Sequence, residues 1–133
     1  MSLNKTIVPS PGISYPDRNI LIALFAVAIM YGMIIPIIIM DLSTRVYQLV
    51  YFNAANIPLI PSSDYISFDR WDLTKLSLIQ KINCQYCSYA NGIAAWTKAV
   101  VNQTELYSCA IKNHHQKNGQ EHHKDFISYE EFQ

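Results

Sequence analysis

Residues 20–40 read ILIALFAVAIMYGMIIPIIIM, a run of about 21 residues without a charged side chain. As an α-helix rising about 1.5 Å per residue, this run is about 30 Å long, which matches the hydrocarbon core of a bilayer. A helix of that length in a water-soluble protein would carry a polar face, and this run has none. The run therefore predicts a helix that spans a membrane.

The membrane helix is expected to cover residues 18–53, with its last part forming an amphipathic extension. Pro36 removes one backbone hydrogen bond inside the apolar run, so a kink is expected between Gly32 and Pro36. Tyr47 and Tyr51, in the extension, suit the headgroup layer of a bilayer.

A cleaved secretory signal is the main alternative for the apolar run. Such a signal has an apolar core of about 7–15 residues and a small-x-small cleavage site, whereas this run is longer and ends Ile-Ile-Ile-Met-Asp. An uncleaved single-pass anchor is therefore expected. Lys5 and Arg18 precede the run and Arg45 follows it, which slightly favours a cytoplasmic amino terminus and a periplasmic remainder.

The composition excludes several classes of function. The chain has 133 residues and a net charge of zero, and no basic stripe that would suit a nucleic acid. It has no phosphate-binding glycine loop and no nucleophile–histidine–carboxylate set, so a stand-alone enzyme is not expected. Roughly 70 residues remain beside the anchor, which is marginal for an independent core and favours help from a metal, a disulfide, the membrane or a partner.

The sequence predicts a mainly α fold, with one N-terminal transmembrane helix followed by a small helical domain that contains cysteine and histidine. Residues 1–17 form a polar N-terminal tail, and residues 54–72 form a linker. The small domain covers residues 73–111. A polar tail that holds all four histidines covers residues 112–133.

Two helices are expected in the small domain, a short one over residues 73–82 and a long one over residues 84–106. Asn83 is a natural N-cap for the long helix. The long helix carries apolar residues at alternating spacings of three and four, which predicts one buried stripe. The stripe consists of Tyr86, Tyr89, Ile93, Trp96 and Val100.

Cys84 and Cys87 form a C-x2-C pair at the expected start of the long helix. A helix N-terminus favours the thiolate form of a nearby cysteine, so the pair could be a redox dithiol or a disulfide. The same spacing suits one metal ion, and Cys109 and His114 would complete a set of three sulfurs and one nitrogen. Such a set suits zinc or an iron–sulfur cluster.

The spacing also argues against that four-ligand site. A straight helix would place Cys109 about 30 Å from Cys84, so the site requires a break in the helix near Gly92 or Asn102. Three hypotheses therefore stay open for the cysteines: a metal site, a redox pair, and thiols that only pack.

The histidines offer a further set of ligands. The pairs His114-His115 and His122-His123 could bind zinc, iron or copper together with Asp125 or Glu121, because imidazole and carboxylate suit these ions. The alternative is that the adjacent histidine pairs, which include His114-His115, form a solvated surface.

Residues 83–92 read NCQYCSYANG, and residues 104–112 read TELYSCAIK. They resemble the motif N-C-x-Y-C-x-Y-x-N-G … T-E-x-[YW]-x-C-x-I-K of a group of small uncharacterised bacterial membrane-associated proteins. The resemblance covers about 40 residues, and it implies a bacterial inner membrane and a shared cysteine arrangement, without a reaction. Asn113 stands where the pattern continues with histidine, so His114 is displaced by one position.

These observations lead to two hypotheses about function. In the first, the chain is a small membrane-anchored protein whose Cys84, Cys87 and Cys109, with His114, bind a metal or form a thiol redox site. In the alternative, it is a non-catalytic accessory or assembly subunit of a larger membrane complex. The expected partners are the lipid bilayer and other membrane subunits or further copies of the chain.

Overall fold

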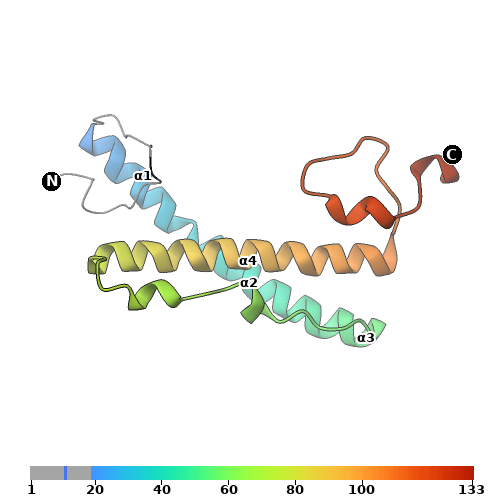
Figure 1. Ribbon diagram of the computed structural model, residues 1–133, viewed down its shortest axis with the longest axis horizontal. Helices are drawn as coiled ribbons and strands as arrows, with labels where there is room; N and C mark the ends of the chain where they lie inside the picture. Colours follow the sequence, from blue (N-terminus) through green and yellow to red (C-terminus); the bar gives the residue numbers. More distant parts are fainter. Residues whose placement is uncertain (1–10, 12–18) are drawn as a thin grey trace.

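The computed structural model describes Pro11 and residues 19–133, so the predicted tail over residues 1–17 lies outside the described residues apart from Pro11. The described part is mainly helical, which confirms the expected fold class. Two long helical rods lie side by side and cross at an angle, as Figure 1 shows.

The first rod runs from Ile20 to Ala55. It consists of α1 (Ile20–Gly32), α2 (Ile34–Tyr47), a π-helical turn η2 (Gln48–Phe52) and the short α3 (Asn53–Ala55). At 36 residues, the rod is long and apolar enough to span a membrane. The predicted membrane-type helix is therefore present, and it continues two residues past the expected end at residue 53.

The first rod is interrupted at Met33, between α1 and α2. Pro36 has no N–H to donate to the carbonyl of Gly32, and the N–H of Met33 is shared between the carbonyls of Ile29 and Met30 at 3.1 and 3.2 Å. The interruption falls in the stretch where the sequence predicts a kink.

The second rod is one unbroken helix, α4 (Leu78–Ser108). The prediction of two helices over residues 73–82 and 84–106 is wrong, because α4 begins at a capping box. The N–H of Gln80 donates to Ser77 Oγ at 3.3 Å, and the N–H of Ser77 donates to Gln80 Oε1 at 2.9 Å. Asn83 therefore lies inside α4 rather than at its start.

The core lies between the two rods and under the connecting segment. Ile93, Trp96 and Val100 of α4 are buried against Phe52 and Ile57, which confirms the predicted stripe at these three positions. α4 therefore packs along the first rod, and the expected separate Cys/His-containing domain is not confirmed.

The predicted linker over residues 54–72 covers the core from one side. It contains two single 3-10 turns, η3 (Ser62–Asp64) and η4 (Asp69–Asp72). A Cβ atom on Gly92 of α4 would lie 2.7 Å from the carbonyl oxygen of Tyr65 and 2.7 Å from Cγ1 of Ile66. The linker therefore lies directly on the helix at Gly92.

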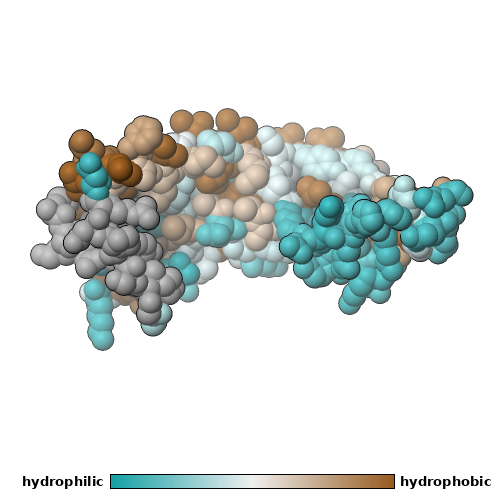
Figure 2. Space-filling model, turned by 90° about the horizontal axis from the view of Figure 1, so that it is seen from above, coloured by the Kyte–Doolittle hydropathy of each residue, from teal (hydrophilic) through white to brown (hydrophobic). Residues whose placement is uncertain are grey.

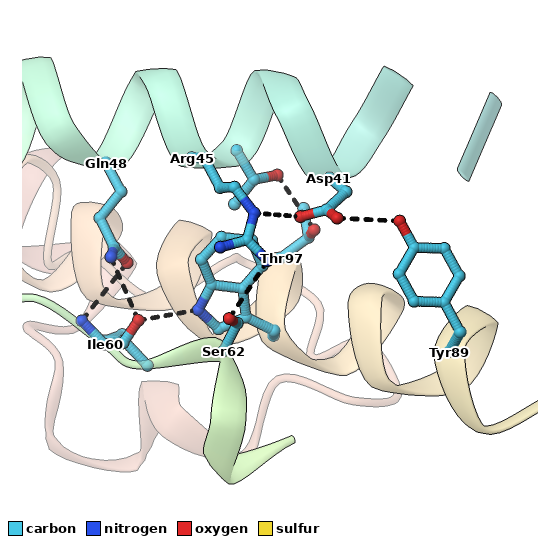
Figure 3. Close-up of polar contacts among 9 residues, drawn as sticks. Asp41, Arg45, Gln48, Ile60, Ser62, Tyr89 and Thr97 are labelled. Atoms are coloured by element: carbon cyan, nitrogen blue, oxygen red, sulfur yellow. Dashed lines mark hydrogen bonds and ion pairs between the residues drawn. The ribbon is translucent and has the colours of Figure 1, made fainter. Parts of the chain in front are cut away.

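Polar side chains of α2 face α4 rather than solvent, as the close-up in Figure 3 shows. The hydroxyl of Tyr89 donates to Asp41 Oδ2 at 2.8 Å, and Asp41 Oδ1 accepts from Arg45 Nε at 2.7 Å. The hydroxyls of Thr44 and Thr97 lie 3.0 Å apart. The side of α2 that packs against α4 thus carries polar groups beside the apolar Ile37 and Met40.

Hydrogen bonds from the same region hold the linker over residues 54–72 against the two rods. Gln48 Nε2 and Trp96 Nε1 both donate to the carbonyl of Ile60, at 3.1 and 2.8 Å. The Arg45 guanidinium lies 5.3 Å from the centre of the Trp96 ring, where a cation–π contact adds to the pairing with Asp41.

The C-terminal segment folds back on the end of α4. The N–H of Ile127 donates to the carbonyl of Ala110 at 2.9 Å, and the N–H of Lys112 donates to the carbonyl of Ile127 at 2.8 Å. This bridge closes a loop that contains η5 (Glu121–Asp125), and η6 (Tyr129–Phe132) follows it. The predicted polar tail is therefore folded, although Figure 2 shows that its surface is hydrophilic, in contrast to the apolar surface over α1.

Candidate metal centre

Three side chains that suit a metal ion meet where the C-terminal segment returns to α4. Glu105 lies in the last turn of α4, and His122 and His123 lie in η5. One ligand atom from each residue lies within 4.8 Å of the other two. Two ligands of one zinc ion are at most about 4.2 Å apart, so small side-chain movements would let the three share an ion.

The carboxylate of Glu105 contacts both imidazoles. His122 Nε2 lies 2.7 Å from Glu105 Oε2, within a hydrogen bond. His123 Nε2 lies 3.0 Å from Glu105 Oε1 but without hydrogen-bond geometry, and this atom has no hydrogen-bond partner among the described residues.

His123 is the buried member of the set. Its side chain is enclosed by the end of α4 and stacks on Phe126 with ring centres 4.8 Å apart. A buried ring nitrogen without a partner is uncommon, because the loss of its water contacts is not compensated. Coordination of an ion by His123 Nε2 would compensate this loss.

The electrostatics favour a charged carboxylate at this place. The hydrogen bond with His122 is the main cause that holds the pKa of Glu105 below its usual value of 4.5, and the contact with His123 adds to it, while partial burial opposes it. Metal ligands must be deprotonated carboxylates and neutral imidazoles, so an ion bound here would replace the proton between His122 Nε2 and Glu105, which leaves to solvent.

An open cavity of about 630 Å³ lies beside two of these three side chains. Glu105 and His122 line it, together with Tyr47, Lys98 and Cys109. Three protein ligands leave a fourth position of a tetrahedral ion open, and here such a position could be reached from the cavity.

The structure does not bring together the four ligands that the sequence predicts. Cys84 and Cys87 share one face of α4, and Cys109 follows the last turn of the same unbroken helix. At about 1.5 Å per residue, Cys87 and Cys109 are about 33 Å apart, so the helix break that a shared site requires is missing. The three thiols are free of disulfides.

The structure removes one argument for a redox pair, namely that Cys84 lies at a helix N-terminus. Cys84 is the seventh residue of α4 rather than the first, so the unpaired N–H groups at the helix start lie nearly two turns away. Cys84 is half-buried and Cys87 is exposed. The redox pair itself stays a prediction.

His114 lies apart from the cysteines in a different set of contacts. Its Nδ1 is 3.8 Å from Glu130 Oε1, and its ring centre is 5.1 Å from that of Tyr129. Both members of the His114–Glu130 pair are more than half exposed, which makes it a weak surface pair.

The sequence indicates both histidine pairs as candidate ligands, and the structure brings an unexpected carboxylate to His122 and His123. The expected carboxylate is Glu121 or Asp125, because both lie next to the histidines in the chain. The carboxylate that meets them is Glu105, 17 residues before His122. The polar position of Glu105 near the end of a helix was the one available signal.

No protein-family model, no curated protein and no solved structure matches this chain. Its function must therefore be argued from the chemistry of its own residues.

Proposed function

We propose that this chain is a small membrane-anchored protein that binds one transition-metal ion at Glu105, His122 and His123. The observation that carries the proposal is the convergence of three ligand atoms within 4.8 Å of one another, among them the buried His123 Nε2, which lies 3.0 Å from a Glu105 oxygen without hydrogen-bond geometry. The anchor in this proposal is the apolar rod from Ile20 to Ala55.

The donor set indicates the class of ion. Two imidazoles and one carboxylate suit Zn²⁺, Fe²⁺ and Cu²⁺, and they do not suit an iron–sulfur cluster, which is held mainly by thiolates. Bound metal would also tie the C-terminal segment to α4, because the ligands come from both. A stabilising role for the ion follows directly, and catalysis would require a substrate at the open position.

The test is the metal content of the full-length chain, purified in mild detergent and dialysed against Zn²⁺. We expect about one zinc per chain. Glu105→Gln and His122→Ala should each lower zinc affinity by about tenfold or more, because even the loss of an outer-shell partner typically costs 10–100-fold. His115→Ala is the matched control, since His115 is an exposed histidine outside the set.

Two results would contradict the proposal. The first is wild-type zinc binding by both Glu105→Gln and His122→Ala. The second is loss of zinc from Cys84→Ser or Cys87→Ser with Glu105→Gln unaffected, which would return the site to the cysteines that the sequence favoured. The accessory-subunit hypothesis stays a prediction, and migration of the chain in a larger complex would test it.

A further inference from the structure

α2 and η2 have an inverted distribution of polar and apolar residues. Thr44 and Gln48 are buried against α4 and the linker, with 6% and 7% of their surface exposed. The opposite side of the same helix is apolar and open, with exposed fractions between 44% and 67%. It consists of Ile35, Ile38, Ile39, Leu42, Val46, Leu49 and Val50.

Water does not favour this arrangement. Exposed apolar surface costs roughly 25 cal/mol per Å², and water-soluble monomers rarely leave a continuous patch of more than a few hundred Å² open. In a bilayer the preference is reversed, because polar and ionisable groups are stable only when they face the protein interior and pair there. Asp41 meets this requirement through Arg45 and Tyr89.

The open apolar side continues the exposed apolar surface of α1 and ends at Val50. From Ile20 to Val50 it is about 45 Å long, close to the 40–45 Å thickness of a bilayer that includes its headgroup layers. Centred in that span, a hydrocarbon core of about 30 Å covers about residues 25–45, so Asp41 lies at its level and must pair with protein groups. The residues after about 45 lie in the headgroup layer, where Tyr47 and Tyr51 stack with ring centres 5.4 Å apart.

We infer that phospholipid covers the outward side of the first rod as far as Val50, so that the metal centre lies at the membrane surface. The hydroxyls of Tyr47 and Thr104 lie 2.8 Å apart, and Thr104 precedes the ligand Glu105. The level of Tyr47 in the bilayer therefore sets the level of the metal centre. This inference rests on the proposed membrane anchoring.

The experiment uses the full chain in phosphatidylcholine vesicles that contain a phospholipid with a photoactivatable diazirine near the glycerol end of its acyl chain. After irradiation, mass spectrometry locates the lipid adducts residue by residue. We expect adducts on Leu42, Val46 and Leu49 at a yield similar to that on Ile38, and none on Tyr129 of the C-terminal segment, which is 39% exposed. Hydroxyl radicals in the water phase should modify Tyr129 and spare Leu49.

Three results would overturn the inference. Adducts on Ile38 but radical damage at Val46 and Leu49 would mean that the lipid ends near Met40. Protection of Val46 and Leu49 from both reagents would mean that protein, such as a second copy, covers them. Absence of adducts along Ile20–Met40 would remove the anchoring as well. Zinc content measured on the same vesicles reports separately on the metal centre.

Discussion

The contact between the linker and α4 at Gly92 makes a quantitative prediction. Gly92→Ala introduces a Cβ atom 2.7 Å from Ile66 Cγ1 and 2.7 Å from the carbonyl oxygen of Tyr65. The Ile66 side chain can rotate to relieve the first contact, but the Tyr65 carbonyl belongs to the backbone. The linker must therefore move away from the helix, which loosens the packing of Ile66 and its neighbours on the core.

Two effects of opposite sign determine how much Gly92→Ala changes the free energy of unfolding. Alanine stabilises a helix interior by about 1 kcal/mol relative to glycine. Overpacking a tight contact costs about 1–3 kcal/mol, and a fixed backbone atom places this contact near the upper end. We therefore expect Gly92→Ala to lower the free energy of unfolding by about 2 kcal/mol, which corresponds to a melting temperature lower by about 8 °C.

The assay is thermal unfolding of the full chain in detergent, followed by the near-ultraviolet circular dichroism of its buried aromatic residues. Gly32→Ala is the matched control, because nothing lies within 4 Å of a Cβ atom at Gly32. It should leave stability unchanged or raise it slightly. If Gly92→Ala were as stable as Gly32→Ala, the linker would not lie on α4 as described, and the reasoning would be refuted.

Three further predictions follow from hydrogen bonds and charge. Trp96→Phe removes the bond to the carbonyl of Ile60 and should cost about 1 kcal/mol of unfolding free energy, and an unchanged value would contradict it. Ser77→Ala should cost about 1 kcal/mol and speed amide exchange in the first turn of α4, whereas unchanged exchange would mean that the capping box does not hold this turn. The folded pKa of Glu105 is lower than its unfolded value, so its contribution to stability is complete above pH 4.5 and is lost as the pH falls through the folded value. Proteolysis of the C-terminal segment should accelerate over that acidic range in wild type but not in Glu105→Gln, and equal acceleration in both would locate the cause elsewhere.

The sequence predicts those features that depend on near neighbours in the chain. The apolar run, the interruption beside Pro36 and the stripe of Ile93, Trp96 and Val100 all follow from spacing within one helix. The start of α4 was also readable, since Ser77 and Gln80 have the spacing of a capping box. The prediction of a helix start at residue 84 is wrong because Asn83, which is also a good N-cap residue, outweighed the capping box at Ser77.

The candidate metal centre could not be predicted in the same way. It depends on a single bridge between Ile111 and Ile127, two short segments without strong strand character. That bridge brings η5 back to Glu105, and nothing in the local pattern of either segment specifies the pairing. The C-x2-C spacing points to the opposite end of α4, because spacing alone does not tell which residues an unbroken helix keeps apart.

The direction of the two rods has a consequence for the order of folding. They run parallel, so hydrogen bonds that link α1 or α2 to α4 among the described residues join positions 48–57 apart in the chain. During synthesis the first rod is complete long before Tyr89 and Thr97 leave the ribosome. Until α4 is synthesised, Asp41 and Thr44 therefore lack their partners on it. During that time only Arg45, one turn away, can neutralise the charge of Asp41. The early pairing of these two side chains would let the rod enter a bilayer first and receive α4 afterwards, as a late and slow step of assembly.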